Sequence, residues 1–449
     1  MSRPLVIIGG GITGLTAAYL AARAGEKVVV LEGSPQAGGL LATFTVNDTR
    51  LEHYYHHFFT HDAEIRWLVH ELGLDDHLQF NPATMGIFRD GRLYDFNSPK
   101  DLLRFAPLSF AGKLRFGATS LYLGKLADWR RHEDVPALEW FYRYAGRAAT
   151  EAVWRPMLEV KFGPFAGQVP VAWMIGRLKQ RLGSRERGDE RLGYLRGSLN
   201  VLLDALLKEL SALGVKIVPQ ARVDKLIIRQ NALAAVQTTA GEFEGARFLA
   251  TIPTVHLAPL LREVRPDFAR RLAEIKYFGA VCTLLELDRP LSQVYWLNVA
   301  DAGFPFGGVI EHTNFIPSSV YGGRHIVYLS RYFEVGNALT GMPESEIARM
   351  MIEPLNRIYP QFDRSHVRQA HVFRTLTAAT VCDLQFSHKV PPVVTPLANL
   401  YLATMAHVYP DERSCNNSIR VAANACRLLG IEAPVVPTGA SLSGQIGMG

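Results

Sequence analysis

Short apolar runs and a segment of helical character open the chain. Leu5–Ile8 and Val28–Leu31 are fully apolar and predict two buried strands, and residues 16–24 between them favour a helix. A strand, a helix and a second strand in this order predict a βαβ unit in which the two strands are parallel.

The middle of the chain continues this pattern. After Gly197 and Ser198, five leucines fall on or near one face of a predicted helix, and three apolar strands are expected behind it. The leucines are at 202, 203, 206, 207 and 210, and the strands at 215–218, 221–228 and 246–253.

Two other stretches have different patterns. Residues 98–190 favour helices, and residues 266–392 contain alternating strands with a helix at 344–358, which suits a mixed sheet. Residues 62–72 predict one more helix, with Asp62 as its N-cap. The predicted fold class is therefore α/β, with a helical insertion and a second domain built on a mixed sheet.

Glycines between the first strand and the first helix indicate a dinucleotide site. Gly9 permits the tight turn, Gly11 lets the backbone approach a pyrophosphate, and Gly14 lets the helix pack closely on the strand. The helix N-terminus can bind the phosphates, and Glu32, after the second strand, can accept hydrogen bonds from a ribose. The alternative is an ordinary glycine turn in a βαβ unit, which this combination of strand, helix and acid disfavours.

The residues after Glu32 favour FAD over NAD. Gly38, Gly39 and Thr43 match the ExxxxxGG(R)xxT extension, so the segment resembles flavoproteins of the amine oxidase, protoporphyrinogen oxidase and phytoene desaturase superfamily. Leu40 stands where many members carry arginine. The resemblance implies a glutathione-reductase-like FAD-binding Rossmann domain from residues 1–97, 191–265 and 393–435, a helical insertion at 98–190 and a substrate domain at 266–392.

The resemblance also implies which residues contact FAD. Contacts are expected from both glycine motifs, from a histidine-rich segment, from the start of a later strand and from the last helix. The residues are Gly9, Gly11, Ile12, Thr13, Gly14, Glu32, Gly38, Gly39, Leu40, His57, Phe58, Val223, Met405, Asn417, Ser418 and Ile419.

The histidine-rich segment is RLEHYYHHFFTHD, residues 50–62. It is similar to the flavin pocket of UDP-galactopyranose mutases, which implies that His56, His57 and Phe58 lie against the flavin. The alternatives are a metal site that also uses His53 and His61, and simple packing in the core. Alternation along a strand would point His56 and His57 to opposite faces, so no metal is predicted.

Two functions known among the relatives lack expected residues. Gly308 and residues 403–406 occupy positions where the mutases carry arginines that hold a sugar-nucleotide pyrophosphate. Amine oxidases place a lysine on a substrate-domain strand, where this chain offers Cys282 or Thr283, with Lys276 a few residues earlier. Neither the mutase reaction nor amine oxidation is therefore favoured.

Several polar and aromatic side chains are candidates for the active site. The charged residues 177–194 are expected to form an exposed, mobile loop over the substrate entrance. Trp154, Met157 and Phe162 either line a substrate tunnel or belong to the core. The candidates for proton transfer are His56, His57, His407 and Tyr409, and the candidate pocket residues are Tyr328, Arg331, Tyr332 and His312.

The predicted function is that of an FAD-dependent oxidoreductase of the oxidase or desaturase type, moving a hydride between a hydrophobic or lipid-linked small molecule and flavin N5. No second dinucleotide motif appears, so the expected electron acceptor is oxygen, a quinone or a partner reductase. The alternatives are a mutase-like isomerase and a non-enzymatic prenyl carrier of the Rab GDP-dissociation inhibitor type. The intact glycines and Glu32 argue against a carrier that has lost its cofactor.

Composition limits the location and the partners. The 449 residues carry a net charge of +6 and four cysteines without CxxC spacing, which favours a reducing compartment and a cytoplasmic protein. No secretory signal and no membrane-spanning run is expected, and nothing indicates a nucleic-acid partner. Residues 100–131 hold seven basic and two acidic residues among large apolar ones. They predict either peripheral contact with the inner face of the membrane or an internal helix pair.

Overall fold

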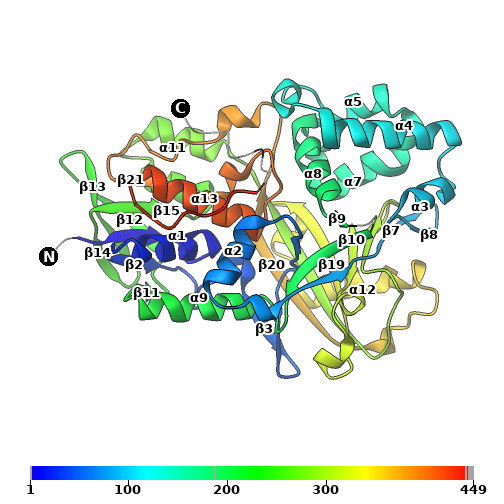
Figure 1. Cartoon of the computed structure of the whole chain (residues 1–449), viewed down its shortest axis with the longest axis horizontal. Helices are drawn as coiled ribbons and strands as arrows, with labels where there is room; N and C mark the ends of the chain where they lie inside the picture. Colours follow the sequence, from blue (N-terminus) through cyan, green and yellow to red (C-terminus); the bar gives the residue numbers. More distant parts are fainter. Residues whose placement is uncertain (1–2, 187–188, 440–441, 443–449) are drawn as a thin grey trace.

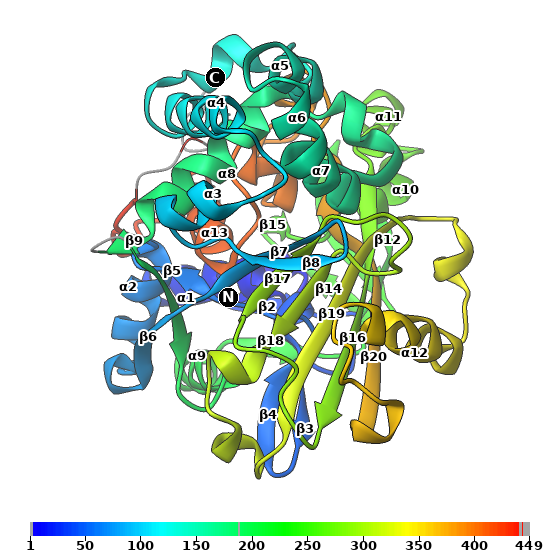
Figure 2. The same cartoon turned by 90° about the vertical axis from the view of Figure 1, so that its right-hand side faces the viewer.

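Three parts make up the molecule in the computed structural model, which describes residues 3–186, 189–439 and 442. A five-stranded sheet with its helices lies on the left of Figure 1, and a seven-stranded sheet lies at the lower right. A group of helices from residues 99–183 lies above the larger sheet in both views (Figures 1 and 2).

The five-stranded sheet is parallel and is assembled from distant segments. Its order is β11–β2–β1–β15–β21, and every neighbouring pair is parallel. Parallel neighbours cannot be joined by tight turns, so each connection is a long crossover. The strands are β1 (Leu5–Ile8), β2 (Val28–Leu31), β11 (Lys216–Val218), β15 (Arg247–Ala250) and β21 (Leu400–Leu402).

Both faces of this sheet are buried. Leu5, Ile7 and Val30 pack in one core with helices α1 (Ile12–Arg23), α9 (Asn200–Ala212) and α13 (Cys415–Leu428). Val6, Ile8 and Leu31 pack in a second core on the other face. That core also holds β12 (Val223–Arg229), β13 (Ala232–Thr238), β14 (Gly241–Glu244), α10 (Thr254–Leu261) and α11 (Pro266–Ala273).

The predicted βαβ unit and the α/β class are confirmed, and so is the leucine-rich helix, which is α9. The first helix begins at Ile12, earlier than the predicted residue 16, because the glycine turn leads directly into it.

The seven-stranded sheet is mixed, with the order β20–β16–β19–β18–β17–β7–β8. Only β7 and β17 pair in parallel. Helix α12 (Glu344–Ile352) packs in the core on one face of this sheet. The strands are β7 (Met85–Arg89), β8 (Arg92–Asp95), β16 (Tyr277–Leu287), β17 (Trp296–Val299), β18 (Gly308–Glu311), β19 (His325–Glu334) and β20 (Val367–Thr380).

Strands β7 and β8 correct one expected domain boundary. The boundary at residue 97 assigned them to the FAD-binding domain, but β7 pairs with β17 and extends the larger sheet. The sequence-based division missed this pairing because it joins residues about 210 positions apart, from Met85 to Trp296.

A third, small sheet corrects the expected loop at 177–194. Helix α8 (Val171–Gly183) continues through part of this stretch, and β10 (Asp189–Leu195) pairs between β5 (Phe58–Phe59) and β6 (Leu78–Pro82). Leu192 and Tyr194 are buried, and Arg181 forms an ion pair with the buried Glu190 at 3.0 Å. Arg181 and Glu190 are thus largely internal and paired, and residues 177–186 and 189–194 lie in a helix and in strands and turns rather than in a loop. The rest of the predicted loop, 187–188, lies outside the described residues.

Aromatic stacking holds the helical group together. The Trp154 ring lies 4.4 Å from Phe141 and 4.8 Å from Phe116, centroid to centroid, so Trp154 belongs to the core. Besides α8, the helices are α3 (Pro99–Arg104), α4 (Phe110–Leu121), α5 (Ala137–Tyr144), α6 (Arg147–Ala149) and α7 (Arg155–Phe162).

The predicted helix after Asp62 is confirmed as α2 (Ala63–Glu71), and Asp62 is its N-cap residue as predicted, but the Asp62 side chain makes no capping hydrogen bond. The Asp62 carboxylate accepts a hydrogen bond from the Phe59 N–H at 2.8 Å and makes no bond into the helix. Asp62 is 4% exposed, and burial raises its pKa to about 7.

We expect Asp62 to make the free energy of unfolding depend on pH. The raised pKa favours the neutral carboxyl in the folded state, so its contribution is present at low pH and is lost as pH rises toward 7. Asp62→Asn keeps an oxygen for Phe59 but cannot ionise. Between pH 5 and 8 the variant should therefore gain about 2–3 kcal/mol relative to the natural protein.

Urea unfolding at the two pH values measures this difference. Asp134→Asn, at an exposed position, is the control and should follow the natural protein at both. A gain for Asp62→Asn that does not change with pH would show that the carboxyl titrates normally.

Candidate active site

Two glycine turns meet at the end of β1. The Gly38 N–H donates to the Gly10 carbonyl at 2.8 Å. A Cβ atom on Gly14 would lie 2.0 Å from the Gly9 carbonyl oxygen, and one on Gly39 would lie 3.2 Å from the Gly11 Cα. Only glycines permit this approach, as the sequence predicted.

The turn leaves open space beside the start of α1. A Cβ atom on Gly11 would meet no heavy atom within 4 Å, so the space beside this backbone is open, and this open space is called the cleft below. No side chain caps the N-terminus of α1. The N–H groups of its first turn, including those of Ile12 and Thr13, are therefore available to an anion such as a pyrophosphate.

Glu32 braces the same turn. Its carboxylate accepts hydrogen bonds from the N–H groups of Gly10 and Ser34, each at 2.7 Å. The Glu32 carbonyl accepts from the Ala221 N–H at 2.8 Å, which brings the start of β12, and with it Val223, to the end of β2. Each carboxylate oxygen keeps a second lone pair for a ribose hydroxyl.

The C-terminal segment approaches from the next strands of the sheet. Met405 lies three residues after the end of β21, and the Ala403 N–H donates to the Ala250 carbonyl at the end of β15. Ser414 caps α13 by accepting from the Asn417 N–H, and the Asn417 amide donates to the Glu412 carbonyl at 2.6 Å.

Other residues expected to contact the cofactor have different surroundings. Leu40 is half-buried, Ser418 donates to the Ser414 carbonyl, and Ile419 is buried in the core beside α1. The Phe58 ring packs against Phe80, so its side chain also belongs to the core.

The cleft fits FAD. Its glycine turns, its uncapped helix and the acid beside it suit the two phosphates and the ribose of a dinucleotide. Gly9, Gly11, Gly14, Glu32, Gly38 and Gly39 would hold the cofactor, and FAD would supply hydride-transfer chemistry.

The histidine-rich segment is not a strand at His56 and His57. Both residues lie in an irregular stretch between β4 (Thr49–Glu52) and β5, so the expected alternation of faces is wrong. His53 stacks on Phe373 with ring centroids 4.1 Å apart, and His61 stacks on Phe59. In the described part of the chain, no three potential metal ligands come together.

His56 and His57 are neutral at physiological pH. Burial, with a smaller contribution from nearby arginines, lowers the pKa of His56 to about 4 and that of His57 to about 3. The His56 Nδ1 bonds to the Tyr54 carbonyl at 2.6 Å, and the His57 Nδ1 lies 3.4 Å from the Tyr295 hydroxyl. Neither ring can therefore serve as an imidazolium acid near pH 7.

His407 has a structural environment. Its Nε2 bonds to the Pro391 carbonyl at 2.9 Å, and its Nδ1 bonds to Thr404. Both ring nitrogens thus brace the loop after β21, and His407 has no nitrogen left for proton transfer. Tyr409 faces a pocket, but burial holds its pKa far above the ordinary value, so the phenol keeps its proton.

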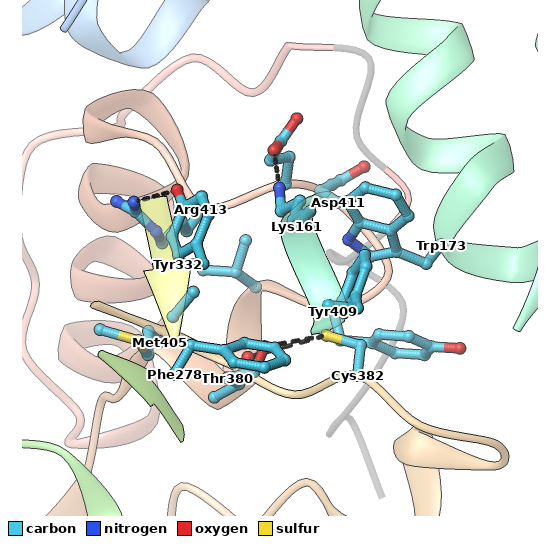
Figure 3. A pocket seen from close by; sticks show the side chains of 14 residues that line it. Lys161, Trp173, Phe278, Tyr332, Thr380, Cys382, Met405, Tyr409, Asp411 and Arg413 are labelled. Carbon is cyan, nitrogen blue, oxygen red and sulfur yellow. Dashed lines mark hydrogen bonds and ion pairs between the residues drawn. The ribbon is translucent and has the colours of Figure 1, made fainter. Parts of the chain in front are cut away.

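The pocket lies where the helical group, the larger sheet and the C-terminal segment meet (Figure 3). Phe162, Trp173, Phe278 and Met405 supply much of its apolar wall. The other lining residues are Lys161, Tyr332, Ala379, Thr380, Cys382, Val408, Tyr409, Asp411, Glu412 and Arg413.

Cations gather on one side of this pocket. Glu412 forms ion pairs with Lys161 and with Arg177, the second at 2.6 Å. Arg413 donates to the Tyr332 hydroxyl at 2.8 Å. Burial alone would raise the pKa of Tyr332, but Arg413 and Lys161 together hold it below its ordinary value.

Alternation along β19 separates the predicted pocket residues. The hydroxyl groups of Tyr328 and Tyr332 bond to Glu52 and Arg413 on one face. Leu329 and Phe333 pack in the core on the other face, so Arg331 between them points away from the pocket, contrary to the prediction.

Strand β16 and the loop after β18 contain the remaining predicted residues of the substrate domain, namely Cys282, Thr283 and His312. The Cys282 side chain packs on the Tyr328 side of the sheet, so Thr283 points to the opposite face. His312 is buried, and its Nε2 bonds to the Tyr321 hydroxyl at 2.7 Å, away from the pocket lining.

The sequence analysis did not predict the three cations on this side of the pocket. Lys161 comes from α7, Arg177 from α8 and Arg413 from the residues before α13, and none belongs to a motif. Only the folded chain brings them together, so no local signal could have predicted the group.

A comparison with protein families decides the class of the protein. The family described as flavin containing amine oxidoreductase matches residues 12–411. The chain belongs to this family. The predicted superfamily, the FAD cofactor and the class of FAD-dependent oxidoreductase are thereby confirmed, and the isomerase and carrier alternatives are not favoured.

Solved structures share the fold over nearly the whole chain. A proposed protoporphyrinogen oxidase from Exiguobacterium sp. 255-15 has a TM-score of 0.77 at 18% identity and covers 96% of this chain and 99% of its own. Reduced UDP-galactopyranose mutase has a TM-score of 0.72 at 14% identity, covering 96% and 94%. Putrescine oxidase has a TM-score of 0.70 at 14% identity, covering 96% and 99%. At these identities the likeness shows the fold alone.

Curated relatives match over different lengths. The coproporphyrinogen III oxidase of Propionibacterium freudenreichii subsp. freudenreichii is 24% identical over 422 residues, which cover 78% of this chain and 76% of that protein. The inactive all-trans-retinol 13,14-reductase of Danio rerio is 61% identical over 41 residues, so the chain spans only 7% of its length.

We expect Gly11→Val to abolish FAD binding without unfolding the protein. Gly11 has φ −74° and ψ 175°, which valine adopts readily, and its Cβ atom meets no protein atom. The side chain would instead fill the cleft that receives the pyrophosphate. Flavin content per chain, from the visible absorption of the purified protein, should fall at least about tenfold.

Gly117→Ala is the matched control, since Gly117 also meets no atom within 4 Å but lies in α4, far from the cleft in sequence. After removal of flavin, both variants should unfold close to the temperature of the natural protein freed of flavin. Full flavin content in Gly11→Val would contradict the assignment of this cleft.

Proposed function

We propose that this oxidoreductase moves a hydride between FAD and a C–H bond of a largely apolar small molecule held in the pocket. The main support is the pocket itself, whose walls include Phe162, Trp173 and Phe278. The segment after β21 supplies Met405 to this wall and begins beside the glycine turns, which links the pocket to the cofactor cleft.

The pocket residues have separable roles in this proposal. The aromatic rings bind the substrate and exclude water, which strengthens every charge inside. Arg413 donates to the Tyr332 oxygen and thus fixes the phenol, whose lowered pKa makes it the best-tuned group in the pocket for holding or moving a proton. When bound, FAD accepts or returns the hydride.

The wider assignments follow the same proposal. Residues 1–97, without β7 and β8, would join 191–265 and 393–435 in the FAD-binding domain. Residues 98–190 would cover the substrate, and 266–392 with β7 and β8 would form the substrate domain. Oxygen, a quinone or a partner reductase would accept the electrons.

Anaerobic mixing tests the substrate class. Coproporphyrinogen III, the compound named for the Propionibacterium relative, has an apolar ring body, whereas putrescine is a small dication. We expect the ring compound to bleach the flavin absorption. Putrescine should not, because Lys161 and Arg413 repel cations. Bleaching by putrescine alone would contradict the proposal.

We also propose that α4 rests on the cytoplasmic face of a membrane. Phe110, Leu114 and Leu121 are 68%, 58% and 56% exposed on one side of this helix, while Phe116 and Thr119 are buried on the other. Exposed basic side chains flank them, at Arg104, Arg115, Lys125, Arg130 and Arg131. This arrangement suits an interfacial helix on anionic lipid. Within the described residues, no helix is long and apolar enough to cross a bilayer.

The double variant Leu114→Ser/Leu121→Ser should weaken binding to vesicles that contain phosphatidylglycerol by at least about tenfold, because two leucines leave the interface. Co-sedimentation measures the bound fraction. Leu376→Ser, at a leucine that is 42% exposed on β20, is the control and should bind normally. Equal loss in both variants, or no binding by the natural protein, would argue against membrane contact.

A further inference from the structure

We propose that a groove under the C-terminal segment binds a small organic cation, with an ammonium group on a largely apolar body. The groove has a volume of about 410 Å³ and lies between α13, α1 and residues 431–438; it is called the C-terminal groove below. No residue that the structure describes lines both this groove and the substrate pocket. The inference therefore goes beyond the proposed hydride transfer and does not depend on it.

Apolar side chains form much of the C-terminal groove. Leu20 of α1 and Val421 of α13 are buried in its wall, and Ala423 is half-buried beside them. The other apolar lining residues come from the segment after α13 and are Ile431, Ala433, Pro434, Val435 and Val436. A groove of this size and lining suits the apolar body of a small molecule.

The C-terminal groove is distinct from the two sites described above. Leu20 follows Ile12 by eight residues, so it lies about 12 Å along α1 from the helix start that borders the cleft. The loop after β21 lies between the groove and the substrate pocket, because His407 lines the groove while Met405 and Val408 line the pocket. A ligand in the groove would thus contact other residues than the substrate does.

A buried carboxylate in the groove lacks one partner. Glu64 of α2 lines the groove and is fully buried. Its Oε1 accepts hydrogen bonds from the Arg420 guanidinium and from the Gly439 N–H, the second at 3.3 Å. Its Oε2 is buried and accepts no hydrogen bond from the residues that the structure describes. An unpaired buried acceptor is unfavourable, so a ligand that donates to this oxygen would be stabilised.

The charges around Glu64 favour a cationic donor. Arg420 pairs with both Glu64 and Asp411, so one guanidinium serves two carboxylates. Asp62 adds a third carboxyl group nearby, and burial together with the charge of Glu64 raises its pKa to about 7. Burial lowers the pKa of His61, which is therefore neutral at physiological pH and adds no positive charge. This excess of negative charge attracts an ammonium group more strongly than a neutral donor.

The charges at the rim leave this preference unchanged. Arg427 and Glu432 both line the groove and are exposed, so their opposite charges offset each other and are screened by the solvent. An anionic ligand would place its charge beside Glu64, where repulsion would oppose binding. The ligand class is therefore an apolar ammonium compound.

The first test compares two ligands with the same indole body, tryptamine and tryptophol, which carry an ammonium and a hydroxyl group at neutral pH. The FAD-loaded protein is titrated in an anaerobic calorimeter, so that turnover adds no heat. We expect one tryptamine to bind per chain, at least about tenfold more tightly than tryptophol, because charge-assisted hydrogen bonds are the stronger ones. Glu64→Gln keeps an acceptor for Arg420 and Gly439 but lacks the charge, so it should remove the preference.

Three further variants locate the site. Ala423→Phe should fill the groove and weaken tryptamine binding at least about tenfold, since a closely packed site has no room for both rings. Ala348→Phe, at a half-buried alanine on α12, is the matched control and should bind tryptamine normally. Phe278→Leu, which changes the wall of the substrate pocket, should also bind normally.

The proposal is overturned if tryptamine at millimolar concentration does not bind, if tryptophol binds equally well, or if Ala423→Phe binds like the natural protein. Weaker binding in Phe278→Leu with full binding in Ala423→Phe would place the amine in the substrate pocket instead. If Glu64→Gln does not fold, the two ligands on the natural protein and Ala423→Phe still decide. Failure of the proposed hydride transfer would appear separately, as a flavin that no substrate bleaches.

Discussion

One carboxylate, that of Glu412, connects the parts of the molecule that form the pocket. It forms ion pairs with Lys161 of α7 and Arg177 of α8, and the Glu412 carbonyl accepts from Asn417 at the start of α13. Burial alone would raise the pKa of Glu412, but Arg177 and Lys161 lower it well below the ordinary value, so the group stays ionised. Removing the Glu412 carboxylate would leave the largely buried side chains of Lys161 and Arg177 without an anion between them, which destabilises the fold.

This connection explains why the pocket lies where it does. Helices α7 and α8 belong to the group inserted before β10, whereas residues 405–413 follow the last strand of the parallel sheet. Joining them at Glu412 closes the space above β16, β19 and β20 and leaves a small pocket with aromatic walls and a cationic side. The residues just after β21 begin beside β15, next to the glycine turns of residues 9–14 and 38–39 that border the dinucleotide cleft. The proposed cofactor and substrate sites are therefore linked through one stretch of chain.

The sequence was sufficient to predict those features of the structure that depend on residues close together in the chain. Glycine spacing, a strand, a helix and Glu32 suffice to specify a dinucleotide turn, because each residue acts on its immediate neighbours. The sequence could not predict which face Arg331 and Tyr332 occupy, since the register of β19 depends on its partners. It also failed at 177–194, where charges that suggest solvent are paired inside the fold. Lys161, Arg177 and Arg413 are brought together only by tertiary contacts. They are now the candidate polar groups of the active site in place of His407, whose ring is bonded to the backbone.

The central claim is that this chain is a flavoprotein whose cofactor is bound in the cleft beside Gly11. The most direct measurement is the visible absorption spectrum of the protein purified without added flavin, followed by identification of whatever heat denaturation releases. We expect the bands of an oxidised flavin and about one FAD per chain, because the chain has a single dinucleotide motif. A colourless protein that also fails to take up added FAD would contradict it.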